Sequence, residues 1–238
     1  MTYFEGFITP VGTGNQDSYL RHARQFTSMA PEFGISRMVE AWADEVPHGQ
    51  VTDFYRAVQA NDDETVVFSF FEYPSKKERD AANEKFMSDP RMADMMKDMP
   101  FDPKRMVIGG FQSIVEAGGE RGNYINGFIA PVPIENKDAY VAMTERQAGI
   151  FREYGALRLV QAWGDDLPDG QITDFKRAVK ANPNETVVLA FIEWPSKEAN
   201  QAAWDKIMKD ERMQPGEAPF DGKRMFWGGF EPIVDERA

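Results

Sequence analysis

The chain has 238 residues, of which 42% are hydrophobic and 13% aromatic, and this is enough apolar material for one large core or two ordinary ones. Because it has no cysteine, disulfides, thiolate metal sites, iron–sulfur clusters and cysteine nucleophiles are excluded. A formal net charge of −12 opposes contact with phosphate backbones, so we expect no nucleic-acid partner.

The first residues lack both a basic start and a long apolar run, which argues against a signal peptide. Nowhere does an apolar run approach the roughly 18 residues that a membrane helix requires. We therefore expect a soluble, cytoplasmic protein with no membrane partner.

The predicted elements begin with a strand over residues 3–9, rich in aromatic and branched side chains and followed by Pro10. Apolar residues then recur every three or four positions from Tyr19 to Phe33, which predicts an amphipathic helix, and Gly34 stands where a left-handed cap belongs. Two strands are predicted over 35–42 and 65–73. A helix follows Ser75, and a last strand covers 105–115.

The same succession then occurs a second time. Residues 3–92 align without a gap with residues 124–213, and 43 of these 90 positions are identical. Further on, residues 101–106 match 220–225. The polar, glycine-rich segment between the copies is typical of a linker. We therefore predict a first repeat over 1–117, a linker over 118–123 and a second repeat over 124–238.

The order strand, helix, strand, strand, helix, strand is that of a ferredoxin-like βαββαβ unit. Such a unit carries both helices on one face of an antiparallel sheet, so the other face needs cover. Two units in one chain can cover each other. We predict an α+β fold in which two ferredoxin-like units form an intramolecular dimeric α+β barrel.

Several short motifs carry a family resemblance. They are the two Asp-Phe-x-Arg-Ala-Val segments at 53–58 and 174–179, the Pro-Ser pairs at 74–75 and 195–196, and residues 101–106 with Gly109, Gly110 and Phe111. In these motifs the chain resembles two copies of the YbaA-like bacterial family, domain of unknown function 1428, in the dimeric α+β barrel superfamily. The resemblance implies a barrel and a cytoplasmic protein. It implies no reaction, because related families include cofactor-free monooxygenases, haem enzymes and isomerases.

Polar groups beside aromatic residues occur at matching positions of both copies. They are Trp42, Asp44, Asp53, Arg56 and Arg105 in the first, and Trp163, Asp165, Asp174, Arg177 and Arg224 in the second. One interpretation is a ligand pocket in each half, in which arginine holds an anionic or carbonyl group, aspartate acts as acid or base and tryptophan forms a wall. The alternative is a set of ion pairs that fixes the long connection. A pocket with Arg56 or Arg177 pointing into it would favour the first; a filled barrel and surface-paired arginines would favour the second.

The two histidines, His22 and His48, correspond to Met143 and Asp169, so a symmetric imidazole site for haem or metal is excluded. We expect His22 to be structural or partly exposed and His48 to be solvated. The methionines at 92, 95, 96 and 99 have helical spacing, which suggests either a Cu(I) site or a flexible cap on the core; we favour the cap. We expect no metal and no cofactor.

Two further features of the repeat allow two interpretations each. Glu72 and Glu193 could supply a second carboxylate to a pocket or face solvent from their strand. The glycine pairs at 109–110 and 228–229 lie within predicted strands and lack the lysine that a phosphate loop requires. A bulge or a close approach of another group explains them better.

Together these features predict a protein that binds a small organic molecule in a pocket of each repeat, with catalysis that requires no cofactor as one form of this hypothesis. The alternative is a non-catalytic structural or interaction protein in which the repeated polar motifs stabilise the barrel. Beyond the intramolecular pseudo-dimer, the sequence leaves further homo-dimerisation open.

Overall fold

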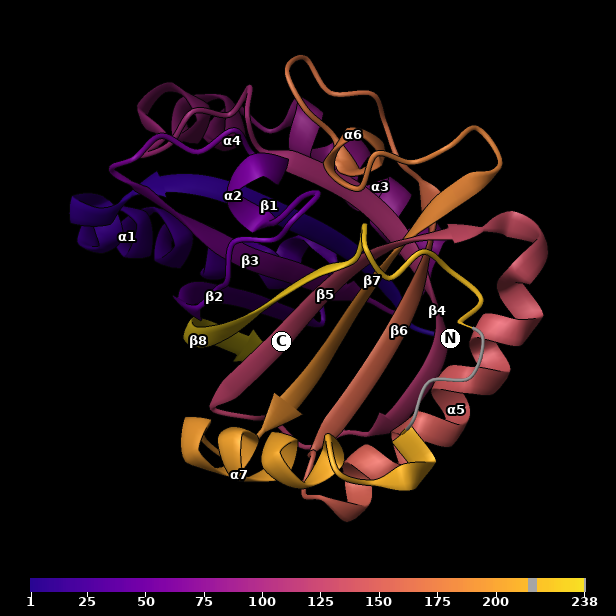
Figure 1. Cartoon of the computed structure of the whole chain (residues 1–238). Coiled ribbons are helices and arrows are strands. Elements are labelled where there is room, and N and C mark those ends of the chain that lie inside the picture. The colour runs from indigo at the N-terminus through magenta and orange to yellow at the C-terminus, as the bar shows by residue number, and fades with distance from the viewer. Residues whose placement is uncertain (214–217, 238) are drawn as a thin grey trace.

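The computed structural model describes residues 1–213 and 218–237, and its central feature is a closed barrel of eight antiparallel strands (Figure 1). Residues 214–217 and 238 of the predicted second repeat lie outside the described residues. The strands are β1 (Tyr3–Gly12), β2 (Arg37–Glu45), β3 (Glu64–Tyr73), β4 (Val107–Gly118), β5 (Tyr124–Pro133), β6 (Arg158–Asp166), β7 (Glu185–Trp194) and β8 (Phe226–Arg237). The predicted α+β class is confirmed.

The two halves each contribute four neighbouring strands to this barrel. Its order is β1-β3-β2-β8-β5-β7-β6-β4, so the first half supplies β4-β1-β3-β2 and the second β8-β5-β7-β6. The halves join where β2 pairs with β8 and where β4 pairs with β6, and each of these pairings contains register shifts. The inner sheet face of each half is thereby covered by the other half, as the sequence predicts.

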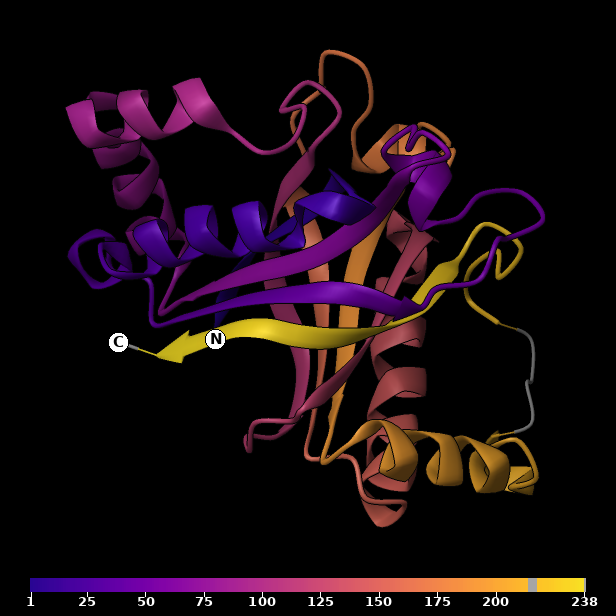
Figure 2. The same ribbon diagram turned by 90° about the vertical axis from the view of Figure 1, so that its left-hand side faces the viewer.

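The longer helices lie outside the barrel, those of the first half on one side and those of the second on another (Figure 2). The α-helices are α1 (Gln16–Thr27), α2 (Phe54–Ala57), α3 (Lys76–Ser88), α4 (Pro90–Met95), α5 (Lys137–Glu153), α6 (Phe175–Ala178) and α7 (Lys197–Ile207). Short 3-10 turns are η1 (Thr13–Asn15), η2 (Ala30–Phe33), η3 (Met96–Asp98), η4 (Ile134–Asn136) and η5 (Glu211–Met213). None of the described helices is long and apolar enough to cross a membrane.

The first helix is shorter than its apolar pattern predicts. It ends at Thr27, and a 3-10 turn carries the chain on to Gly34, whose φ of 73° is the predicted left-handed cap. Pro31 lies in this turn, and a proline lacks the N–H that continues a helix. The matching position of the second half is Arg152, and α5 there runs unbroken through Glu153.

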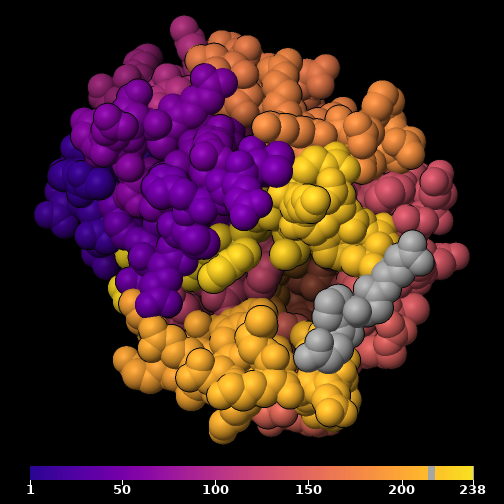
Figure 3. Space-filling view, in the orientation of Figure 1, coloured from indigo at the N-terminus to yellow at the C-terminus, as the bar shows by residue number. Residues whose placement is uncertain are grey.

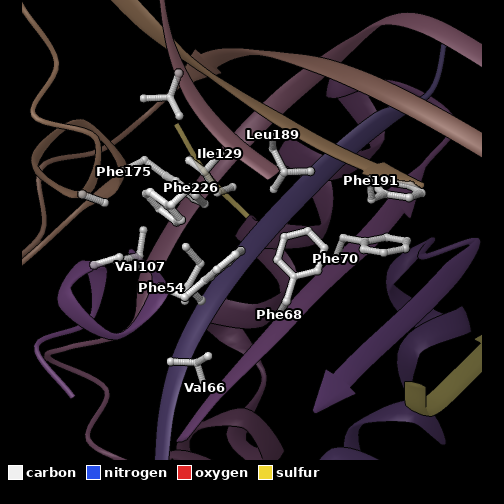
Figure 4. Close-up of a cluster of buried hydrophobic side chains, with 14 of the residues drawn as sticks. Phe54, Val66, Phe68, Phe70, Val107, Ile129, Phe175, Leu189, Phe191 and Phe226 are labelled. Carbon is white, nitrogen blue, oxygen red and sulfur yellow. The ribbon is translucent and has the colours of Figure 1, made fainter. Parts of the chain in front are cut away.

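Side chains from both halves fill the barrel interior as one apolar core (Figure 4). Phe70 of β3 and Phe191 of β7 stack at its centre, with ring centroids 4.2 Å apart and planes 11° from parallel. Phe54 of α2 and Phe175 of α6 also belong to this core. These two short helices were not predicted from the sequence. Because each half supplies part of this core, we expect neither half to complete its core without the other.

A buried charge network lies inside the barrel, on the same strand faces as the central phenylalanines. Arg37 donates two hydrogen bonds to Glu193, of 2.7 and 2.8 Å, and Arg158 donates to Glu72 at 2.6 and 3.2 Å. Arg37 also binds Asp235 at 2.8 Å. Of the two interpretations of Glu72 and Glu193, the solvent-facing one is therefore wrong, because both point inward and are bound by an arginine of the other half.

Close packing explains the second glycine of each pair. A Cβ atom on Gly110 would lie 2.3 Å from the Tyr3 hydroxyl oxygen, and one on Gly229 would lie 2.1 Å from that of Tyr124. Tyr3 in turn donates a 2.5 Å hydrogen bond to Asp165 of the other half. The close approach that the sequence suggested is thus confirmed.

Candidate functional site

The Asp-Arg pairs at matching positions of the two copies fix the loops that carry α2 and α6. Asp53 caps α2 by accepting from the Arg56 backbone N–H at 2.8 Å, and Asp174 caps α6 in the same way from Arg177 at 2.9 Å. The Arg56 guanidinium donates to the Gly49 carbonyl at 2.7 Å while its side chain remains 53% exposed. Arg177 is placed alike, with 52% exposure. These arginines lie at the surface.

Arg105 and Arg224 fasten the start of the last strand of each half. Arg105 binds both carboxylate oxygens of Glu64, at 2.6 and 2.7 Å, and Arg224 binds Glu185 at 2.7 Å twice. Each also donates to the carbonyl of a residue with positive φ, which is Gln59 in the first half. Such bidentate pairs hold backbone geometry that a non-glycine residue seldom adopts.

The tryptophans and the remaining aspartates lie on the outer faces of β2 and β6. Trp42 packs against Tyr19, with ring centroids 6.3 Å apart, and Trp163 is buried beneath Lys137. Asp44 accepts a 3.0 Å hydrogen bond from Tyr124 and so mirrors the bond between Tyr3 and Asp165. Both contacts join one half to the other.

None of these ten residues lines either of two cavities that lie between the outer sheet faces and the helices that cover them. The barrel interior is filled and Arg56 and Arg177 are paired at the surface, which is the arrangement that the loop-fixing alternative predicts. A ligand-binding role for the ten residues stays a prediction.

A cavity of about 320 Å³ lies instead between the outer sheet face of the first half and the helices that cover it. Strands β1, β2 and β3 form its floor, α1 and α3 its sides, and α4 with the segment after it closes the remaining side. We call this space the first-half cavity. Its size falls within the range of small-molecule sites, roughly 300–1,000 Å³.

The Glu40 carboxyl lies on the floor of this cavity, and the residue is only 5% exposed. Tyr19 donates a 2.6 Å hydrogen bond to Glu40 Oε2, and the Ser69 hydroxyl donates to the same oxygen. Among the described residues no donor reaches Oε1. Burial raises the pKa of the Glu40 carboxyl to about 7, although the bonds from Ser69 and Tyr19 act in the opposite direction. Near neutral pH this carboxyl can therefore either accept or donate a proton.

The walls of the first-half cavity are mainly aromatic rings and methionines. The rings are Phe7, Phe26, Phe71, Phe86 and Phe101. Met92 is buried and Met96 is 64% exposed, which agrees with the flexible cap predicted for this methionine run. His22 also lines the cavity, its imidazole edge-on to Phe101 at 6.1 Å, and partial burial lowers its pKa. His48 is exposed, as expected.

A second polar corner of the first-half cavity contains Glu5 of β1. Asn83 of α3 donates a 3.2 Å hydrogen bond to its carboxyl, and the Arg79 guanidinium lies 3.6 Å away. Burial raises the pKa of Glu5, while Asn83 and Arg79 lower it. The buried Tyr73 hydroxyl has no hydrogen-bond partner among the described residues. The cavity thus has polar groups at two places and an apolar surface between them.

The second half has a corresponding cavity of about 560 Å³ against its own outer sheet face. Figure 3 shows a hollow between the gold segment of α7 and the yellow segment that leads into β8. We call this space the second-half cavity. Within the described ranges, no group of three or more histidine, aspartate or glutamate side chains is placed to hold a metal ion.

The titration of Glu40 gives a pH-dependent stability that Glu40→Gln removes. The pKa of Glu40 is about 7 in the folded chain and about 4.5 in the unfolded chain. Between pH 4.5 and pH 7 the carboxyl is therefore ionised in the unfolded chain but still protonated in the folded chain. The folded state consequently loses stability as the pH rises through this range. We expect the variant to gain up to about 3 kcal/mol over wild type between pH 4.5 and pH 8. Urea unfolding of both proteins at pH 4.5 and at pH 8 measures this free energy. If the difference in unfolding free energy between variant and wild type is the same at both pH values, Glu40 titrates normally.

Known protein structures share the overall fold of this chain. A "putative monooxygenase" from Lactobacillus acidophilus NCFM has a TM-score of 0.61 at 10% identity, covering 99% of this chain and 96% of that one. An anthrone oxidase-like protein has a TM-score of 0.53 at 13% identity, covering 100% and 93%. At such identities the likeness concerns the fold alone.

Closer relatives exist at the sequence level. The uncharacterised protein YbaA of Escherichia coli K12 is 55% identical over 115 residues, which are 48% of this chain and 98% of that protein. YbaA of Shigella flexneri matches to the same extent. The family model described as "Protein of unknown function (DUF1428)" matches twice, over residues 2–103 and 123–222. The chain therefore belongs to this family and carries two tandem copies of its domain.

Proposed function

We propose that the first-half cavity binds a flat, mostly apolar organic molecule and that Glu40 acts there as the general base in a proton transfer. The observation that carries this proposal is a buried carboxyl with a pKa of about 7 on the floor of an aromatic-lined cavity. A base works best when its pKa lies near the working pH, and burial in an apolar site is a usual way to reach that value.

The lining defines the class of substrate. Aromatic and methionine walls favour a ring system over a sugar or a charged metabolite, and a volume of about 320 Å³ suits two or three fused rings. The proton to be removed must belong to a weak acid, such as a phenol or a C–H group next to a carbonyl. Hydrogen bonds from Tyr19 and Ser69 hold the Glu40 carboxyl in position, since both are made to Oε2.

The name of one structural neighbour refers to a molecule of this class. An anthrone is an enolisable aromatic ketone, so the name of the anthrone oxidase-like protein refers to a C–H acid of this kind. The neighbour from Lactobacillus acidophilus is described as a "putative monooxygenase", which names no substrate. Their low identity transfers the fold only, and the chemistry proposed for this chain rests on Glu40.

We propose further that each half is a ferredoxin-like unit, with boundaries 1–117 and 124–238 and a linker over 118–123. The strand order β4-β1-β3-β2 of the first half and the matching order of the second support this description. The fused chain then provides in one molecule the covered sheet faces that a single unit would need a partner to obtain.

The exchange of carbon-bound hydrogen in 2-tetralone, an enolisable bicyclic ketone, tests the proposed proton transfer. Glu40 takes a proton from the carbon next to the carbonyl, the enolate forms, and a deuteron from the solvent replaces the proton. We expect wild type in D₂O to accelerate loss of this proton NMR signal about 100-fold or more over buffer. Exchange at the buffer rate at pH 8 would favour the non-catalytic alternative.

A further inference from the structure

The two cavities of the chain differ in the chemistry of their floors. We infer that the second-half cavity is a separate binding site that holds an aromatic ketone or quinone through N–H donors of Gln161 and transfers no proton. This inference rests on the proposed function in one respect, which is that both cavities are taken as small-molecule sites.

The floor residues of the second half occupy the same strand positions as those of the first but carry different groups. Gln161 replaces Glu40, Ala190 replaces Ser69 and Ala130 replaces Thr9, and on the covering helix Met143 replaces His22. The tyrosine is retained: Tyr140 donates a 2.7 Å hydrogen bond to Gln161 Oε1, as Tyr19 does to Glu40. The hydrogen bond from the tyrosine to the floor is thus preserved in the second half, while the carboxyl that it binds in the first half is replaced by an amide.

This replacement changes what the floor can recognise. An ionised carboxylate only accepts hydrogen bonds, whereas an amide always carries two N–H donors. With Tyr140 bound to its oxygen, Gln161 keeps these donors for a ligand. A ligand placed against it therefore needs an acceptor such as a carbonyl oxygen, while a ligand beside Glu40 needs a donor proton.

The position that matches Glu5 has changed in the same direction. Asn126 replaces Glu5, and its side-chain oxygen accepts from the indole N–H groups of Trp194 and Trp204, both at 2.9 Å. The two positions that carry carboxyls at the first-half cavity therefore carry amides in the second half, where Gln161 lines the cavity and Asn126 lies behind its lining residue Trp204. In the part of the chain that the structure describes, no carboxyl lines the second-half cavity.

The remaining lining fits a larger neutral ring system. The cavity measures about 560 Å³ against about 320 Å³ in the first half, and alanines stand where the first half has Ser69 and Thr9. Its charged or titratable side chains, as far as the described residues go, are Tyr140, Arg146 and Arg212, and Arg212 is paired with Asp210 and Glu153. None of these is a proton acceptor at neutral pH.

Titration calorimetry with chromone, a bicyclic aromatic ketone without an acidic proton next to its carbonyl, tests the inference. We expect Gln161→Met to weaken chromone binding about tenfold, the effect of losing one hydrogen bond to the carbonyl. The matched control is Gln201→Met on α7, an exposed glutamine outside the cavity, which should bind chromone as wild type does.

A second variant guards against misfolding. Gln161→Glu keeps the acceptor for Tyr140. Once ionised at high pH, this carboxylate offers no hydrogen-bond donor, so chromone binding at pH 9 should again weaken about tenfold. Chromone that binds both folded variants as tightly as wild type, or that does not bind wild type, would overturn the inference. The 2-tetralone exchange by Glu40 is measured separately, so failure here leaves the proposed function standing.

Discussion

Replacing Glu40 with glutamine is expected to lower the rate of 2-tetralone exchange by about 10²–10⁴-fold, the usual contribution of a positioned general base. Glutamine has nearly the same shape and can still accept the hydrogen bonds from Tyr19 and Ser69, so the fold and the cavity should be retained. Because the substrate is held mainly by the aromatic walls, its affinity should change little. The measurement is the pseudo-first-order exchange rate at saturating 2-tetralone.

The pH dependence separates Glu40 from another base. Wild-type exchange should rise with pH through about 7 and then level off, following ionisation of Glu40. His22 also lines the cavity, but it is partly exposed and its pKa is lowered, so a rate governed by it would level off at lower pH. His22→Gln is therefore the matched variant. If His22→Gln removes the exchange and Glu40→Gln does not, the base has been assigned wrongly.

Breaking the charge network in the barrel is expected to have the largest effect on stability. Arg37 is 1% exposed, and its replacement by methionine leaves Glu193, which is 0% exposed, without its two shortest hydrogen bonds from an arginine. An uncompensated buried charge of this kind usually costs about 3–5 kcal/mol. Since the core is shared by both halves, the loss should appear as one earlier cooperative transition in guanidinium unfolding, followed by circular dichroism.

A double replacement tests whether the cost comes from the buried charge. Arg37→Met with Glu193→Gln removes the stranded carboxylate, so it should be less destabilised than Arg37→Met alone. A single variant that loses under about 1 kcal/mol would show that the network contributes little.

Much of the architecture could be predicted because the same succession of elements occurs twice in the sequence. This repeat predicted that the two halves cover each other's sheet faces. Gly34 and Gly155 stand at matching positions and form the predicted left-handed caps, with φ of 73° and 98°. Glu72 could also have been placed, since it alternates with Phe68 and Phe70 on β3 and so shares their inward face. The arginine that meets it comes from the other half, and no local pattern indicates that partner.

The residues singled out from the sequence and the residues that line the two cavities differ for a physical reason. Residues that match in both copies, such as Asp53 and Asp174, serve contacts that both halves need to fold. Glu40 lies on the strand face turned away from the barrel, which strand alternation alone assigns to solvent. Only the helices above it turn that face into a cavity. The available signal was the difference between copies, Glu40 against Gln161 within otherwise similar strands.

The crystal structure of the chain with 2-naphthol, a bicyclic phenol, tests the central claim most directly. The result we predict is a naphthol ring among the aromatic walls of the first-half cavity, with its hydroxyl within about 3 Å of the Glu40 carboxyl. Naphthol bound beside Asp53 and Arg56 instead, with the space above Glu40 empty, would contradict that claim.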